Sequence, residues 1–317
     1  MPWLIGVDEA GYGPNLGPFV MSSVAVYVTH KTAKVDLWQL LSAAVCRACD
    51  ADDLRLIVDD SKAVYVAAVG LSRLERNLWP FACDGAGPLS LTDYWQRRCL
   101  TGFSELQAEP WYADGLTLPL LGEAVAETAR ARLAEACSAA GVVLGPILSV
   151  AVFPRQVNEL IDRQGSKGAV PAWALGRLLA QLPEPRDDEP TRVYVDKLGG
   201  RNFYREILQT IFPASLVLSR EESADWSSYR VRSEHGACDV SFSPKADGRH
   251  FPVALASMAS KYLREVLMEM FNRFWQQHVP DLERTAGYPG DAERFYKDIS
   301  AARRKLKIAP RILWRKR

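Results

Sequence analysis

The stretch Gly6-Val7-Asp8-Glu9-Ala10-Gly11-Tyr12-Gly13-Pro14-Asn15-Leu16-Gly17-Pro18 decides how this chain folds. The apolar residues 3–7 predict a buried strand and residues 19–28 predict a second one. The glycines and prolines between them predict a tight turn, since glycine adopts torsions closed to other residues and lets main chain approach a ligand. Adjacent side chains of a strand point to opposite faces, so Asp8 and Glu9 converge only if the strand breaks at Glu9. An acidic surface turn is the alternative interpretation.

Bulk composition sets broad limits on fold and function. The chain has 317 residues, 48% of them hydrophobic and 24% charged, which is typical of a soluble globular protein of one large or two modest domains. A net charge of +1 indicates no particular partner, so a nucleic-acid surface would need locally clustered basic groups. Six cysteines without a secretory signal favour free thiols in a reducing compartment. We expect a cytoplasmic monomer without a membrane span or a targeting peptide.

A second strand also ends on a carboxylate. Residues 191–195 have the β-branched and aromatic bias of a strand and lead directly to Asp196. Open α/β sheets place ligands beyond the carboxyl ends of their strands. The spacing G-x-G-x-x-x-G, followed by a strand, is not that of a nucleotide-binding fingerprint, which precedes a helix. The acidic strand ends are therefore the first candidates for a functional site.

The run DEAGYGPNLGP at 8–18 resembles the opening motif of the type 2 ribonucleases H (ribonucleases HII and HIII), usually DEAGRGPLAGP. Later segments resemble other motifs of that family, with Asp196 at the aspartate of a strand-terminal Val-Asp-Gly pattern and Lys197 in place of its glycine. The remaining matches are Asp60-Ser61-Lys62, Lys245-Ala246-Asp247, residues 256–264 (close to AASIIAKVTR) and Gly287-Tyr288. Asp60 or Ser61 also suits a helix cap, and the small residues of 254–260 also suit tight packing on a sheet.

The resemblance implies a set of site residues and a reaction. Four carboxylates, gathered in one place, repel one another unless divalent cations neutralise them, and oxygen ligands favour Mg²⁺ or Mn²⁺. Two such ions about 4 Å apart can clamp the attacking and leaving oxygens of a phosphodiester. The implied activity is hydrolysis of the RNA strand of RNA·DNA hybrids, leaving 5′-phosphate and 3′-hydroxyl ends. The implied catalytic and metal-binding residues are Asp8, Glu9, Asp196 and Asp247, and the implied nucleic-acid contacts are Gly11, Tyr12, Gly13, Ser61, Lys62, Lys245, Ser257, Lys261, Arg264 and Tyr288.

Two features leave alternatives open. Tyr12 replaces the arginine of the family's Gly-Arg-Gly, so the choice between an RNA·DNA hybrid and a duplex carrying single ribonucleotides stays undecided. A nuclease of the same site with another substrate, and a non-catalytic nucleic-acid-binding protein of the same fold, are the other candidate functions. All four acidic positions are filled, which counts against a purely binding role. His250, close after Asp247, is either a proton shuttle or a capping histidine.

The expected fold is a ribonuclease-H-like α/β domain. Its mixed sheet has antiparallel early strands, parallel later strands and helices on both faces. We assign residues 1–270 to the catalytic domain, with an insertion at about 76–120 and an added hairpin at about 220–243, and 271–317 to a helical C-terminal extension. Helices are expected at 35–49, including the Cys46-Arg47-Ala48-Cys49 run, and at 122–140. The aromatics of the insertion either stack on bases or pin it to the core. The basic tail is either a solubilising helix or a phosphate-contacting arm.

Overall fold

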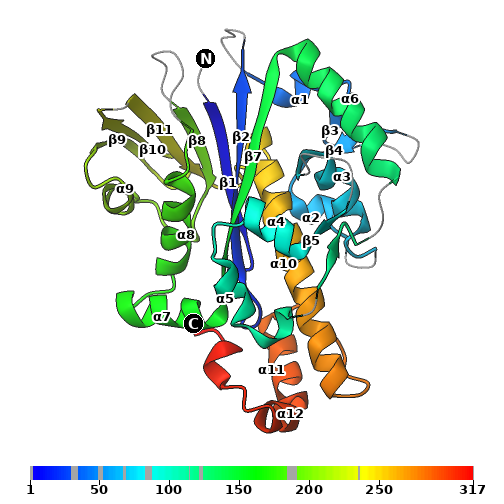
Figure 1. The fold of residues 1–317 in the computed structure, drawn as a ribbon. Helices are drawn as coiled ribbons and strands as arrows, with labels where there is room; N and C mark the ends of the chain where they lie inside the picture. Colours follow the sequence, from blue (N-terminus) through cyan, green and yellow to red (C-terminus); the bar gives the residue numbers. More distant parts are fainter. Residues whose placement is uncertain are drawn as a thin grey trace.

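A seven-stranded mixed sheet forms the centre of the computed structural model, in the order β7-β2-β1-β8-β11-β10-β9 (Figure 1). The structure describes residues 3–29, 35–48, 53–66, 69–82, 88–113, 115–120, 124–183, 191–234 and 236–316. The strands of the sheet are β1 (Trp3–Ala10), β2 (Phe19–Val28), β7 (Val142–Val152), β8 (Thr191–Asp196), β9 (Leu216–Glu222), β10 (Ser227–Ser233) and β11 (Gly236–Ser243).

Strand directions confirm the predicted mixed sheet. β1, β2 and β7 pair antiparallel, whereas β8 lies parallel to both β1 and β11. The parallel part is limited to these three strands, because β10 and β9 return antiparallel at the edge. The hairpin expected at 220–243 is present, but its second strand β11 is an interior strand beside β8. The hairpin therefore forms part of the central sheet.

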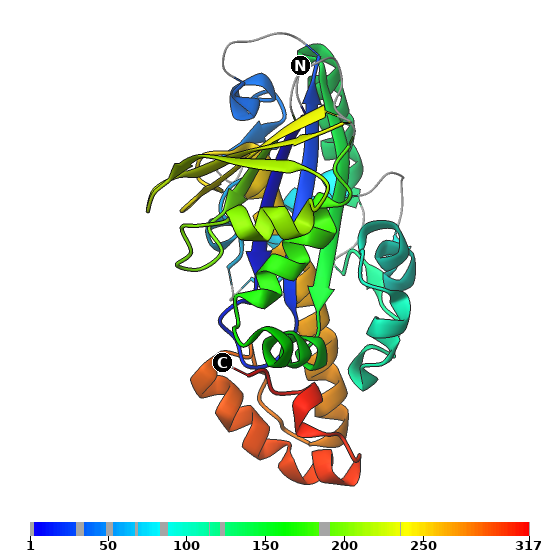
Figure 2. The ribbon, with the colours of Figure 1, turned by 90° about the vertical axis from the view of Figure 1, so that its left-hand side faces the viewer.

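Helices cover both faces of the sheet, as predicted (Figures 1 and 2). On one face α7 (Pro154–Gln164), α8 (Ala169–Leu179) and α9 (Arg205–Ile211) bury their apolar residues against the strands. On the other face the long helix α10 (Phe251–His278) packs along β1 and β2, joined by the smaller elements of residues 37–140. Among the described residues, none of the helices combines the length and apolarity needed to span a bilayer.

Gly6 allows α10 to lie directly against β1. A Cβ atom placed on Gly6 would lie 2.0 Å from the carbonyl carbon of Pro252, which is a backbone atom that has no rotamer to change. Further along the same helix the Ser260 hydroxyl donates to the backbone oxygen of Asp8 at 2.9 Å. The start of α10 is therefore fixed against the strand that carries the acidic residues.

The region between β2 and β7 differs from its prediction. The helix expected at 35–49 is only α1 (Leu37–Leu40), since the chain turns and Val45 and Cys46 form a short strand. Cys46 is buried there, and Cys49 lies outside the described residues. The short elements of this region are β3 (Val45–Cys46), β4 (Leu56–Ile57), α2 (Ser61–Val64), α3 (Ser72–Ala82), β5 (Leu89–Ser90), α4 (Leu91–Arg98), α5 (Phe103–Gln107), η1 (Pro110–Tyr112), β6 (Thr117–Leu118) and α6 (Ala124–Ala140).

The segment taken as an insertion contains helices despite its weak periodicity. Trp79, Trp95 and Trp111 are at most 5% exposed and belong to the core under the sheet. Trp111 also packs edge-on against Phe271 of α10, with ring centroids 5.1 Å apart. The indole rings therefore pin this segment to the core, which was the second of the two expectations for them. The sequence pattern missed these helices because their large side chains are buried by tertiary contacts on several sides. Such a segment lacks the 3.6-residue hydrophobic period of a helix with one apolar face.

The C-terminal segment returns to the glycine turn between β1 and β2. It contains α11 (Pro289–Asp298), α12 (Ser300–Lys305) and η2 (Pro310–Ile312), which lie beyond the end of β1 (Figure 1). Arg315 is 1% exposed, its backbone N–H donates to Asn15 O at 2.9 Å, and its guanidinium donates to Pro14 O. This part of the basic tail is therefore buried against the turn and does not extend as an arm.

Candidate active site

Strand register places Asp8 and Asp196 side by side. Val7 of β1 pairs with Val195 of β8 in parallel register, so the next residue on each strand is a carboxylate. Partners in a parallel pair point to the same face of the sheet. Val7 and Val195 are buried in the core under α7–α9. Asp8 and Asp196 therefore point to the opposite face, on which α10 packs.

Asp247 reaches the same place from the loop after β11. Ser243, at the end of that strand, pairs with Asp196, and the chain then turns through Lys245, whose φ is +54°. The Ala246 N–H donates to Asp196 Oδ1 at 2.8 Å, and the Gly248 N–H donates to Asp247 Oδ1 at 2.8 Å. Backbone donors thus hold both carboxylates, and the loop places Asp247 beside the two strand-end aspartates.

Glu9 does not converge by a break in its strand. β1 continues in register through Glu9, paired with Met21, to Ala10, so the expected break is wrong and Glu9 leaves the strand on the face opposite to Asp8. The Asp8 and Asp196 charges nevertheless act on it. Its Oε2 atom is buried, and none of the residues that the structure describes is its hydrogen-bond partner. Such an oxygen is costly unless a proton or a cation reaches it.

All four carboxyl groups have raised pKa values. Burial raises the pKa of Asp8 most, followed by the charge of Asp196 and then of Asp247. Burial followed by the Asp8 charge raises the pKa of Glu9. The pKa values of Asp196 and Asp247 are raised chiefly by burial, with a further contribution from Asp60. This mutual effect indicates that the four groups share one electrostatic environment.

Helix α2 lies beside the acidic group and was expected there on resemblance alone. Asp60 caps the helix by accepting from the Lys62 N–H at 2.9 Å, so the capping interpretation holds. The Lys62 charge lowers the pKa values of Glu9, Asp196 and Asp247, so its ammonium also acts on the acids. The Ser257 hydroxyl of α10 lies 3.1 Å from Ser61 Oγ and also hydrogen-bonds to Asp8, lowering its pKa.

The glycine turn brings further groups to the site. Gly11 has φ of +84° and Gly17 of +77°, conformations that favour glycine. Tyr12 is half-buried beside Gly199, in the loop that follows Asp196, and the Lys167 ammonium lies 5.0 Å from the centre of its ring. Exposed Tyr288 comes close to Gly13, since a Cβ there would lie 3.8 Å from its ring.

Two of the cations expected to bind phosphate have internal partners instead. Arg264 is 1% exposed and donates to Ala286 O at 2.9 Å and to Glu265 at 3.2 Å. Lys261 pairs with the same carboxylate at 2.8 Å and lies over the ring of Tyr65. Arg264 joins α10 to the 286–288 loop, which in turn accepts from Asn15 and Leu16 of the glycine turn through Gly287 O. Arg264 therefore links α10 to the glycine turn through its two terminal nitrogens, whereas its buried Nε–H has no hydrogen-bond partner among the described residues.

Two departures from the expected pattern have local explanations. Lys197 turns away from the acids, and its ammonium donates to Asn202 Oδ1 and to the backbone oxygens of Ser223 and Ala224 at 2.7–2.8 Å. His250 stacks on Tyr194 with ring centroids 3.9 Å apart. Burial lowers the pKa of His250 to about 4, so the imidazole is neutral at neutral pH. That state does not suit a histidine that must carry a proton near pH 7.

The donor chemistry of this site suits a hard divalent cation. Carboxylate oxygens that raise one another's pKa, including a buried Glu9 oxygen without a partner, are the ligands that Mg²⁺ and Mn²⁺ take. As the side chains stand, no three His, Cys, Asp or Glu residues in the described ranges are arranged to hold a metal ion.

Several solved structures of type 2 ribonucleases H are similar to this chain. The match to ribonuclease H2 from Pyrococcus horikoshii OT3 covers 98% of this chain and 92% of that protein, with 16% identity and a TM-score of 0.47. The match to ribonuclease HII from Archaeoglobus fulgidus, which was solved in complex with PCNA, covers 99% of this chain and 94% of that protein. The identity is 15% and the TM-score is 0.44. Bst-RNase HIII in complex with Mn²⁺ matches 99% of this chain and 66% of its own, with 17% identity and a TM-score of 0.42.

These similarities extend over nearly the whole chain at 12–17% identity. No protein-family model matches the chain, and no curated protein sequence matches it. A TM-score below 0.5 describes a loose superposition, which places no individual residue of this chain.

Sequence reasoning missed three charged residues near the site. Asp60 was considered only as a cap and motif position, although its charge raises the pKa values of two of the acids. Lys167 follows α7, and Arg201 follows β8 and its charge acts on Tyr12. The glycine-flanked Gly165-Ser166-Lys167-Gly168 run was the available signal, but only the tertiary fold brings it to Tyr12.

Proposed function

We propose that this protein is a metal-dependent endoribonuclease that hydrolyses the RNA strand of RNA·DNA hybrids. The observation that carries the proposal is that Asp8 and Asp196 lie on one face at the end of two paired parallel strands, while Asp247, in the loop after β11, is close enough for its charge to raise the pKa of Asp8. Backbone N–H groups donate to all three carboxylates. Buried acids that raise one another's pKa destabilise a fold, so a site that gathers them indicates function. The products are 5′-phosphate and 3′-hydroxyl ends.

Mg²⁺ or Mn²⁺ held by Asp8, Glu9, Asp196 and Asp247 would supply Lewis-acid polarisation of the phosphodiester and an acidified water. The surrounding residues orient these carboxylates. The Glu9 N–H donates to Asp8 Oδ1 at 2.7 Å, and the Ala246 N–H fixes Asp196. Lys62 offsets part of the negative charge as a phosphate approaches. The carboxylates thus bind the cation and the lysine acts on the phosphate, which explains why a lysine lies beside four acids.

The substrate strand is expected to follow the glycine turn. Gly11 and Gly13 leave the backbone accessible, and Tyr288 offers an exposed ring beside Gly13. Lys167 adds positive charge beside Tyr12, and Lys245 adds it in the loop that leads to Asp247. Tyr12 supplies no guanidinium to a ribose 2′-hydroxyl, and this favours cleavage within hybrid over cleavage at a single embedded ribonucleotide.

The test is a cleavage assay with labelled duplexes in Mg²⁺ or Mn²⁺. Wild type is compared with Asp196→Asn and with Asp298→Asn, a control whose exposed carboxylate pairs with Arg294 on α11. We expect cleavage of the RNA strand in wild type and the control, and a loss of at least about 100-fold in Asp196→Asn. Cleavage by Asp196→Asn at the wild-type rate would refute the assigned site.

The choice of duplex separates the remaining candidates. An RNA·DNA hybrid, a DNA duplex with one ribonucleotide, double-stranded RNA and branched DNA are offered to the same preparation. Cleavage of the hybrid alone supports the proposal, whereas cleavage of only another duplex assigns a different substrate to the same acids. Tight binding of hybrid without cleavage in either metal would identify a non-catalytic binding protein.

A further inference from the structure

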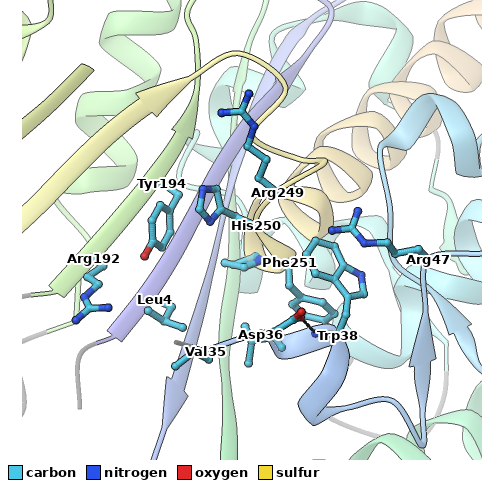
Figure 3. Close-up of a pocket in the computed structure, with 12 residues that line it drawn as sticks. Leu4, Val35, Asp36, Trp38, Arg47, Arg192, Tyr194, Arg249, His250 and Phe251 are labelled. Atoms are coloured by element: carbon cyan, nitrogen blue, oxygen red, sulfur yellow. Dashed lines mark hydrogen bonds between the residues drawn. The ribbon is translucent and has the colours of Figure 1, made fainter. Parts of the chain in front are cut away.

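A cavity lies next to the acidic site along β8 and differs from that site in its chemical character. It encloses about 350 Å³, within the range of small-ligand pockets. Its lining combines the apolar Leu4, Phe251 and Pro252 with aromatic rings and arginines. Figure 3 shows Leu4 and Phe251 between the aromatic residues of the two sides. None of its charged groups belongs to the proposed acidic site.

Three arginines from three separate parts of the chain surround this cavity. Arg47 follows β3, Arg192 lies on β8 and Arg249 lies in the loop before α10. Arg47 has Asp59 3.5 Å away, but within the described residues no ion pair joins Arg192 or Arg249 to an acid. Asp36, the acid of the lining, accepts from the Trp38 and Gln39 N–H groups as the cap of α1. The rim therefore carries net positive charge.

The walls offer flat rings for stacking. Tyr194 and His250 form a face-to-face pair with an interplanar angle of 13°, and Figure 3 shows them together on one side of the cavity. Trp38 lies on another side, with the Arg47 guanidinium 3.6 Å from the centre of its ring. The start of α10, a helix of 28 residues, adds the positive end of its dipole. Aromatic walls with guanidinium groups at the mouth suit a planar base attached to a phosphate.

One face of β8 joins this cavity to the acidic site. Arg192, Tyr194 and Asp196 alternate with the buried Thr191, Val193 and Val195, so the three point to the same side of the sheet. Tyr194 is two residues from Asp196, or roughly 7 Å along the strand. A nucleic-acid strand whose phosphodiester lies at the acids can therefore extend a neighbouring nucleotide into the cavity.

We infer that this cavity binds a single unpaired nucleotide, with its base against the Tyr194–His250 pair and its phosphate on one of the two arginines that flank the pair, Arg192 or Arg249. The nucleotide is either a free mononucleotide or one unit of the substrate strand, and the second source rests on the proposed nuclease function. The chemistry is the same in both cases, namely a ring stacked on aromatic side chains and a phosphate bound by guanidinium groups.

The first experiment uses the full chain in EDTA, so that it depends neither on catalysis nor on a bound cation. Adenosine 5′-monophosphate and ribose 5-phosphate are titrated calorimetrically into wild type, Arg192→Gln/Arg249→Gln and the control Arg163→Gln/Arg205→Gln, in which both residues are exposed. We expect saturable binding of the mononucleotide, at least tenfold weaker binding in the first double variant, and at least tenfold weaker binding of the sugar phosphate. Absence of saturable binding, or equal affinity in both double variants, would overturn the inference.

The second experiment distinguishes the two sources. KM is measured for a fully paired hybrid and for a hybrid with one unpaired nucleotide next to the cleaved position. The ratio compared is the KM of the hybrid with the unpaired nucleotide divided by the KM of the fully paired hybrid. If this ratio is at least threefold higher in Arg192→Gln/Arg249→Gln than in wild type, the cavity binds part of the substrate strand. An unchanged ratio, together with lost mononucleotide binding, assigns it to free nucleotides. A chain that cleaves nothing would refute the nuclease proposal, while the binding result in EDTA would stand.

Discussion

The hydroxyl oxygens of Ser61 and Ser257 lie 3.1 Å apart, although one residue begins α2 and the other lies on α10. This contact fixes the helix that carries Lys62 against the helix that packs under β1. Ser257 also hydrogen-bonds to Asp8, and its single hydroxyl proton serves either partner by rotation. The serine pair therefore connects the lysine, the first acid and the long helix.

Ser257→Ala is expected to shift the acid limb of the cleavage profile to higher pH. The hydrogen bond from Ser257 lowers the pKa of Asp8, so its removal raises that pKa, and a higher pH is needed to ionise the carboxylate. The measurement is the pH dependence of kcat/KM on the hybrid. Ser260→Ala is the matched control, because Ser260 donates to the backbone oxygen of Asp8 and not to its carboxylate. Equal shifts in both variants would contradict the assignment.

The acidic site is expected to destabilise the fold as pH rises. Burial and mutual repulsion raise the pKa values of Asp8, Glu9, Asp196 and Asp247 in the folded state, so the folded chain holds protons that the unfolded chain has released. Stability from these groups is complete below their ordinary values, near pH 4, and is lost as pH rises through the raised values. In EDTA at pH 7, Asp196→Asn should therefore be more stable by roughly 0.5–2 kcal/mol. Urea unfolding of wild type and Asp196→Asn at pH 4 and pH 7 measures this difference in the free energy of unfolding. A variant that is less stable than wild type at pH 7 would refute the prediction.

Divalent cations are expected to reverse that destabilisation. A cation that binds only the folded chain stabilises it by about 2.7 kcal/mol at a concentration 100 times Kd. Mn²⁺ should raise Tm in wild type and in Asp298→Asn, but much less in Asp8→Asn and Asp196→Asn. Differential scanning calorimetry at neutral pH, with Mn²⁺ and then with EDTA, provides the comparison. The same rise in Tm in all four proteins would place the cation elsewhere.

The sequence predicted the strand ends better than the details of the site. The hairpin around the glycine turn and the strand ending at Asp196 followed from apolar runs and turn residues, which are local properties. The parallel register of β1 and β8 joins residues far apart in the chain, and no local pattern contains it. The burial of Arg264 was also hidden, because a basic residue beside Lys261 on a helix looks the same in sequence whether it faces solvent or a loop.

Gly6, the one glycine of β1, is predicted to tolerate no side chain. Gly6→Ala places a methyl group 2.0 Å from the backbone of Pro252, so α10 must move away from the strand. We expect a loss of about 3 kcal/mol, at the upper end for overpacking. Gly290→Ala is the control, since it lies within α11 with nothing within 4 Å of the added methyl group and should be neutral or stabilising. Chemical denaturation measures both, and equal stabilities would show that helix and strand can separate freely.

Arg264 is predicted to act on stability, whereas Lys261 is expected to have a small effect. Arg264→Met removes the donor to Ala286 O, so the 286–288 loop loses this link to α10. It also removes the donor to Glu265, whose carboxylate keeps its hydrogen bond from Lys261. Breaking a buried pair by removing one partner costs about 3–5 kcal/mol. Lys261→Met removes a partly exposed cation and should cost less than about 1 kcal/mol. The two are compared by urea denaturation and by the Kd for hybrid, measured at a temperature where both variants are folded. If Arg264→Met retained wild-type stability but lost hybrid binding, the guanidinium would have to reach the phosphate backbone, and its burial beside Gly11 would have to open when substrate binds.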